Sequence, residues 1–125
     1  MNTERILQVA AEIEAMPHAV EREDPDLEFD LEFENAGFNM LMWNDAEPCG
    51  TVCCIGGYIA PTGGDRLKQV ADQLGLTLDT ADLLCYPILP TDDWSNITPV
   101  QAARVLRHLA ETGKVDWSII KASAP

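Results

Sequence analysis

Four cysteines and two histidines are the residues of this chain whose types could bind a metal or attack a substrate. Zinc sites in proteins usually contain a Cys-x-x-Cys pair, and no two cysteines here have that spacing. Because that spacing is missing, a small metal or thiol protein is the alternative hypothesis and not the leading one. Its ligands would come from Cys49, Cys53, Cys54 and Cys85, joined by His18 or His108.

These thiols are expected in two different environments. Cys53 and Cys54 lie in an apolar stretch and are expected in the core, as small hydrophobic residues. Cys49 is expected at the start of a helix, a position that favours a thiolate. Because no nucleophile is spaced from a histidine in a recognisable way, we assign no catalytic residue and no cofactor, and we expect a protein that is not an enzyme.

The clearest pattern in the sequence is an alternation of acidic and apolar residues over positions 26–34. A period of two is typical of a β-strand, in which successive side chains point to opposite faces. One face would carry only carboxylates, and the other only large apolar side chains. We predict a partner-binding surface made of Asp26, Glu28, Asp30, Glu32 and Glu34, with Glu23 and Asp24 beside them.

The spacing of this predicted face indicates what it could imitate. Side chains on one face of a strand repeat about every 6.7 Å, and successive phosphates on one DNA strand lie roughly 6 to 7 Å apart. Carboxylates at this spacing can occupy a surface that normally binds a phosphate backbone. The alternative is a structural or accessory protein whose acidic strand only keeps it soluble.

Charge is distributed unevenly along the chain. Residues 1–47 contain 13 acidic and two basic residues, whereas residues 48–125 contain eight acidic and six basic residues. The formal net charge of -13 disfavours direct binding to nucleic acid or to an anionic membrane. The expected partner is therefore a basic protein.

The remaining pattern predicts an α+β fold, a mainly helical small domain of about five helices with a small antiparallel hairpin. The hairpin would pair residues 26–34 with residues 38–43, and residues 45–48 would form a loop. The helices are predicted over residues 3–16, 49–59, 65–74, 79–86 and 98–112, with an irregular connection at 88–96.

Local signals support several of these elements. Thr98, Pro99 and Gln101 have the order of an N-cap, a first-turn proline and the partner residue of a capping box. The first helix would bury an apolar stripe made of Ile6, Leu7, Ala10, Ile13 and Met16. Near the C-terminus, the alternating residues Val115, Trp117 and Ile119 predict either a last strand or a docked tail.

A chain of 125 residues is long enough for one domain with its own core. We expect a single domain over residues 1–125, with an acidic helix-plus-strand part at 1–47 and a helical part at 48–125. No apolar run reaches the ~20 residues of a membrane-spanning helix, and the N-terminus has no signal-peptide pattern. We therefore expect a protein of the host-cell cytoplasm with reduced cysteines.

The middle of the chain also contains a distinctive set of short strings. They are Phe38-Asn39-Met40, Trp43, Cys49-Gly50-Thr51 followed by Cys54-Ile55 and Gly57-Tyr58, Leu74-Gly75-Leu76, and Ile97-Thr98-Pro99 followed by Ala102-Ala103. This set resembles a group of small proteins from phages and bacterial mobile elements, over about residues 38–112. The group has no established activity, so the resemblance implies a biological context and no mechanism.

Together these features predict a non-enzymatic inhibitor of phage or mobile-element type. It would act as a DNA mimic that occupies a basic, nucleic-acid-binding surface of a host defence protein. An anti-CRISPR protein that acts on a CRISPR effector complex would fit this description.

Overall fold

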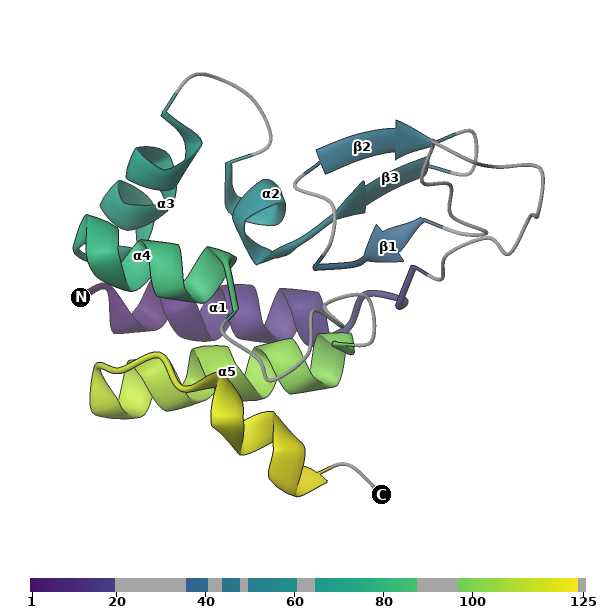
Figure 1. The fold of residues 1–125 in the computed structure, drawn as a ribbon. Coiled ribbons are helices and arrows are strands. Elements are labelled where there is room, and N and C mark those ends of the chain that lie inside the picture. The colour runs from purple at the N-terminus through teal and green to yellow at the C-terminus, as the bar shows by residue number, and fades with distance from the viewer. Residues whose placement is uncertain (20–35, 41–43, 48–49, 61–64, 88–96, 124–125) are drawn as a thin grey trace.

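The fold was examined in a computed structural model, which describes residues 1–19, 36–40, 44–47, 50–60, 65–87 and 97–123. These residues form five α-helices, three short strands and a 3-10 helix (Figure 1). In chain order they are α1 (Thr3–Glu14), β1 (Gly37–Phe38), β2 (Asn44–Glu47), β3 (Gly50–Cys53), α2 (Ile55–Ile59), α3 (Arg66–Leu74), α4 (Leu78–Cys85), α5 (Pro99–Thr112) and η2 (Trp117–Ser123). The prediction of a mainly helical fold with about five helices is confirmed.

Helix α1 is the central element of the domain. It runs antiparallel to α5 on one side and faces α2, α3 and α4 on the other, as Figure 1 shows. Its buried residues are Ile6, Val9, Ala10 and Ile13. The prediction that Leu7 is buried is wrong, because successive helical residues are about 100° apart and Leu7 falls outside the arc that Ile6 and Ala10 share.

Helix α5 begins with the capping box that its sequence predicts. The backbone N–H of Gln101 donates to Thr98 Oγ1 at 3.1 Å, and the backbone N–H of Thr98 donates to Gln101 Oε1 at 2.9 Å. The helix ends at Gly113, whose φ of 77° is the left-handed conformation that glycine tolerates best. Its apolar face lies against α1.

The sheet differs from the predicted one. Strand β3 pairs in parallel with β1 and antiparallel with β2, in the order β1-β3-β2. The predicted loop is wrong at 45–47 and the predicted helical start is wrong at 50–53, because these residues pair as strands from Asn44↔Cys53 to Glu47↔Gly50, while Pro48 lies outside the described residues. The predicted hairpin strand at 26–34 and its partner residues 41–43 lie outside the described residues.

The C-terminal segment docks on the domain as a helix. Residues 117–123 form η2, so the predicted strand is wrong and the docked tail is confirmed. Trp117 and Ile120, three residues apart on one side of η2, are only 4% and 7% exposed. The Trp117 indole N–H donates to the carbonyl oxygen of Leu83 at 2.9 Å, which fastens η2 to α4.

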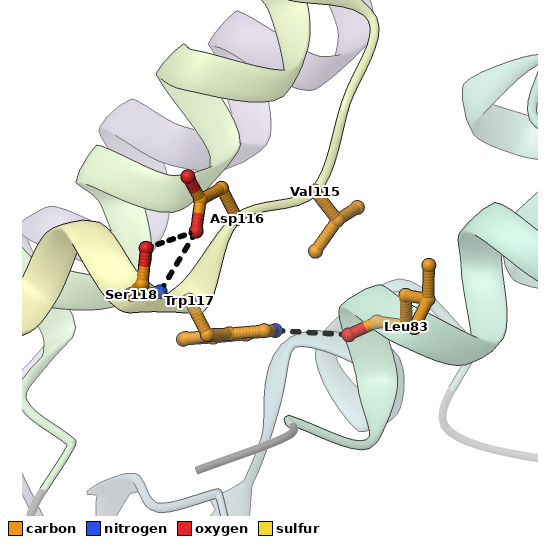
Figure 2. Close-up of a pocket in the computed structure, with 5 residues that line it drawn as sticks. All are labelled: Leu83, Val115, Asp116, Trp117 and Ser118. Atoms are coloured by element: carbon orange, nitrogen blue, oxygen red, sulfur yellow. Dashed lines mark hydrogen bonds between the residues drawn. The ribbon is translucent and has the colours of Figure 1, made fainter.

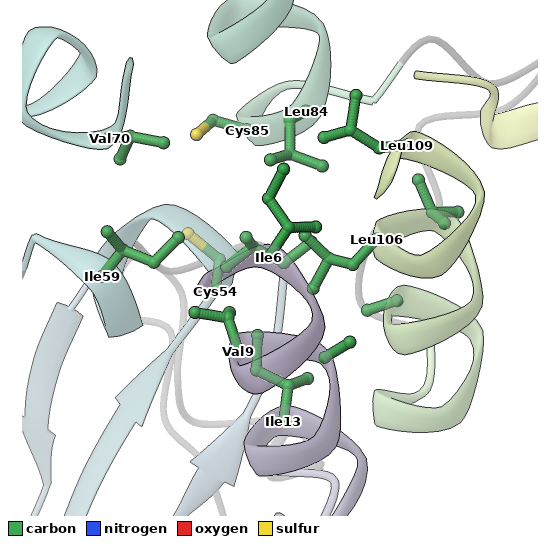
Figure 3. Packing of buried hydrophobic residues seen from close by; sticks show 14 of the residues in the cluster. Ile6, Val9, Ile13, Cys54, Ile59, Val70, Leu84, Cys85, Leu106 and Leu109 are labelled. Atoms are coloured by element: carbon green, nitrogen blue, oxygen red, sulfur yellow. The ribbon is translucent and has the colours of Figure 1, made fainter. Parts of the chain in front are cut away.

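One core joins all these layers (Figure 3). Side chains of α1 occupy its centre, between residues of α5 on one side and residues of α2, α3 and α4 on the other. The side chains labelled in this view are Ile6, Val9, Ile13, Cys54, Ile59, Val70, Leu84, Cys85, Leu106 and Leu109.

Candidate functional site

The predicted acidic surface belongs to a segment whose two ends are described. Its candidate residues Glu23, Asp24, Asp26, Glu28, Asp30, Glu32 and Glu34 all lie outside the described residues. The described chain stops at Ala19, shortly after α1, and resumes at Ala36, directly before β1. The structure therefore shows how the segment is attached to the domain.

Both ends of the segment are joined by hydrogen bonds. The backbone N–H of Phe38 donates to the carbonyl of Pro17 at 2.8 Å, and the backbone N–H of Ala19 donates to the carbonyl of Phe38 at 2.9 Å. The side-chain amide of Asn39 donates to the carbonyl of Ala19 at 3.0 Å. We call residues 17–19 and 37–39 the clasp.

Four of the six clasp residues are buried, namely Ala19, Gly37, Phe38 and Asn39, and the contact between the two strands of chain is sterically tight. Ala19, Phe38 and Asn39 have no exposed surface, and Asn39 is fully buried although it is polar. Gly37 has a φ of 137°, and a Cβ there would come within 2.1 Å of the Pro17 carbonyl oxygen. Only glycine fits at this position, because any side chain would collide with the backbone that the clasp holds.

Sequence reasoning did not assign a role to the clasp. The sequence places Phe38 and Asn39 in the predicted hairpin strand 38–43 and in the strings that resemble phage proteins. The signal available in the sequence was the pair Gly37-Phe38 followed by a polar residue in an apolar stretch. The partner of Asn39 is Ala19, which lies 20 residues earlier in the sequence, and only the folded structure shows that the two residues are in contact.

The three described cysteines of the alternative hypothesis are all buried. Cys53 ends β3, and Cys54 is the N-cap of α2, where its sulfur accepts the N–H of Gly57 at 3.4 Å. Cys85 ends α4. The prediction that Cys53 and Cys54 are core residues is confirmed, although they lie at a strand end and a helix cap. Cys49 lies outside the described residues.

Burial disfavours thiolate chemistry at these positions. It raises the pKa of Cys53 to about 11, and it also raises the pKa of Cys54 and of Cys85. Metal ligands and nucleophiles need the deprotonated form. Among the described residues, no three side chains of His, Cys, Asp or Glu are grouped so that they could hold a metal ion.

Several acidic side chains of the described helices already have partners. Glu14 forms a bidentate pair with Arg107, one of whose two contacts is 3.2 Å long, and the hydrogen bond lowers the pKa of Glu14. Tyr58 donates to Glu12, and burial together with this bond raises the pKa of Tyr58 to about 12. Asp72 pairs with Lys68 at 3.2 Å.

Comparisons with protein-family models, with curated proteins and with solved structures find no match to this chain. None of the helices in the described ranges has the length and apolar character that crossing a bilayer requires. The residues of the phage-protein resemblance that the structure describes are largely core residues, such as Phe38, Cys54, Ile97 and Ala102. They belong to the hydrophobic core.

Proposed function

We propose that this chain is a non-enzymatic acidic binding protein, an inhibitor of phage or mobile-element type that acts in the host cytoplasm. It occupies a basic, nucleic-acid-binding surface of a host defence protein, as an anti-CRISPR protein does when it mimics DNA. The acidic residues 26, 28, 30, 32 and 34 make the contact, with Glu23 and Asp24 at its margin.

The observation that carries this proposal is the concentration of charge in a segment with fixed ends. Residues 20–35 contain eight acidic residues and one basic residue, and the clasp holds the ends of this segment side by side. Like charges at this density cost stability, and a basic partner would remove that cost. A segment anchored at both ends also loses less conformational entropy on binding than a free tail does.

Charge pairing elsewhere favours the same segment. Glu14 and Asp72 are paired with arginine and lysine, and Glu12 accepts a hydrogen bond from Tyr58. Residues 20–35 contain eight acidic residues and one arginine, a formal charge of -7, which is just over half of the net charge of -13 in about an eighth of the chain.

The proposed mechanism is electrostatic and steric competition. A protein surface with basic side chains attracts the acidic segment over a distance of about 8 to 10 Å at physiological salt. Association is then fast, and added salt weakens it because it screens the exposed charges. Nucleic acid and the inhibitor cannot occupy the same surface together.

A pull-down from bacterial lysate tests the proposal. The immobilised chain should retain a basic nucleic-acid-binding protein at 50 mM salt and release it at 500 mM. The variant E28Q/D30N/E32Q should lose this retention. The matched control E4Q/D72N/E111Q changes net charge by the same amount at exposed helical positions, and it should keep the retention.

Two results would count against the proposal. One is that no nucleic-acid-binding protein is retained at either salt concentration. The other is that the control variant loses retention as fully as E28Q/D30N/E32Q, which would mean that only total charge matters. If the partner is retained only because the chain is negatively charged as a whole, the acidic segment has no specific role in binding. That result would favour the alternative of an accessory protein whose acidic strand only keeps it soluble.

A further inference from the structure

The outer face of α4 exposes three large apolar side chains to solvent. Its inner face is buried through Ala81, Leu84 and Cys85. Its outer face combines apolar and acidic side chains, namely Leu78, Asp79, Asp82, Leu83 and Tyr86, and we call these five residues the α4 face. Leu78, Leu83 and Tyr86 are 54%, 40% and 46% exposed.

A small cavity lies next to this face (Figure 2). It has a volume of about 190 Å³ and is lined by Leu83, Val115, Asp116, Trp117 and Ser118. We call it the Trp117 hollow. Figure 2 shows the Val115 side chain and the Leu83 carbonyl oxygen on the side of the Trp117 indole N–H, which bonds to that oxygen, while the Leu83 side chain extends away from the ring. Asp116 lies beside them, where Ser118 donates its backbone N–H at 3.0 Å and its hydroxyl.

The size of the hollow indicates what it can accept. Sites for small molecules and cofactors usually measure about 300 to 1,000 Å³, and the hollow is smaller than that. It suits a single apolar side chain. Exposed large apolar residues that border a cavity are typical anchor points of protein interfaces.

The charge of the surface decides which kind of partner fits. Asp79 and Asp82 lie on the α4 face and Asp116 lies at the hollow, and hydrogen bonds from Ser118 lower the pKa of Asp116 so that it stays ionised at neutral pH. The sequence contains no Lys, Arg or His between Lys68 and Arg104. Among the described residues, Arg66 acts electrostatically on Tyr86 and His108 on Asp116, and Lys114 precedes Val115 in the sequence.

We propose that the α4 face and the Trp117 hollow form a second binding site, which takes a cationic amphipathic segment of a partner protein. One apolar side chain of the segment enters the hollow, and its lysine or arginine side chains pair with Asp79, Asp82 and Asp116. Amphipathic helices commonly bind apolar surfaces in this way, through residues three and four positions apart. The site is separate from the proposed function, since it uses no residue of the acidic segment.

Other occupants fit the surface less well. Nucleic acid and anionic lipid are repelled by the same carboxylates that attract a cationic segment. A second copy of this chain carries the same net charge of -13 and is repelled as well. A cationic amphipathic segment is the occupant that matches both the apolar and the charged parts of the surface.

Nuclear magnetic resonance on the full ¹⁵N-labelled chain tests this proposal with a defined probe. The probe is a synthetic 18-residue peptide with leucines on one helical face and lysines elsewhere. All variants are made in the E28Q/D30N/E32Q background, so that binding to the acidic segment is suppressed. The peptide should shift the Trp117 indole N–H signal and the amide signals of Leu83 and Ser118.

Paired variants separate the apolar and the charged contributions. L83S should weaken peptide binding about tenfold or more, whereas L7S, which changes an equally exposed leucine on α1, should not. D79N/D82N should weaken binding and reduce its salt dependence, whereas D72N on α3 should leave both unchanged. A peptide of the same composition with its leucines scattered around the helix should bind at least tenfold more weakly.

Three results would overturn the proposal. The first is that the peptide leaves the Trp117, Leu83 and Ser118 signals unchanged. The second is that L83S and L7S have the same effect. The third is that these signals move with protein concentration alone, which would make a second copy of the chain the occupant. Because every variant carries the same three substitutions in the acidic segment, none of these results bears on the proposed function.

Discussion

The side-chain amide of Asn39 donates a hydrogen bond to the carbonyl oxygen of Ala19 at 3.0 Å, across 20 residues of sequence. Both residues are fully buried. This contact closes the acidic segment 20–35 on the domain, next to the end of α1. The most charged part of the chain is therefore attached to the domain through a buried contact.

Asn39→Ala should lower the free energy of unfolding by about 1 to 3 kcal/mol, because it leaves a buried carbonyl without its donor. Urea unfolding followed by circular dichroism measures this loss. Gln8→Ala removes an exposed side-chain contact with Arg5 and should change the same quantity by less than about 0.5 kcal/mol. Equal effects of the two substitutions would show that the clasp contact does not stabilise the fold.

The buried thiols should be unreactive in the folded protein. Burial raises the pKa of Cys53 to about 11 and raises that of Cys54 and Cys85 too, so these thiols stay protonated at pH 8. Iodoacetamide at pH 8, followed by peptide mass spectrometry, should modify them only slowly until urea is added. Rapid modification of Cys54 or Cys85 in the native protein would favour the alternative of a thiol or metal protein.

The pair of Glu14 and Arg107 predicts a pH dependence of stability. The hydrogen bond from Arg107 lowers the pKa of Glu14 below its usual 4.5, so the pair contributes fully above pH 4.5. That contribution is lost as the pH falls through the lowered pKa of the folded state. Glu14→Gln should therefore be less stable than the natural chain at pH 7, and the difference should shrink at pH 3.

Substitution of both residues tests whether the ion pair between Glu14 and Arg107 causes this pH dependence. Arg107→Gln should show the same pH dependence as Glu14→Gln, and the double variant should add little to either. Urea midpoints at pH 7 and pH 3 give the comparison. A difference between the natural chain and Glu14→Gln that is equal at both pH values would contradict the assignment.

The capping box of α5 should contribute measurably to stability. Thr98→Ala removes the acceptor of the Gln101 N–H and should cost about 1 kcal/mol. Thr112→Ala, near the end of the same helix, removes a bond to the His108 carbonyl and one from the Lys114 N–H, and it should cost less because both bonds are exposed to solvent. Thermal unfolding of the two variants measures the difference, and an equal shift in both would contradict the capping role.

The sequence predicts best those elements whose signals are local. The start of α5 depends on Thr98, Pro99 and Gln101, which lie within four positions of one another. The end of α3 depends on Gly75, which has the left-handed φ of 66° expected of a helix-terminating glycine. These signals depend only on residues close in sequence, so they determine where a helix starts or ends independently of the tertiary contacts.

Elements that depend on distant contacts were predicted less well. The sequence predicts β3 as part of a helix, because Val52 and Cys53 are compatible with either structure. Pairing with the distant strands β1 and β2, in which Cys53 lies opposite Phe38 and Asn44, decides the outcome. The Trp117 hollow depends on a contact between residues 34 positions apart.

The most direct test of the central claim is competition between the chain and DNA for the same partner. Fluorescence anisotropy of a labelled duplex bound to the partner retained in the pull-down measures it at 50 mM salt. We predict that the natural chain and E4Q/D72N/E111Q displace the duplex, and that E28Q/D30N/E32Q does so at least tenfold less effectively. Displacement by all three proteins at equal concentration, or by none, would contradict the claim that the acidic segment mimics DNA.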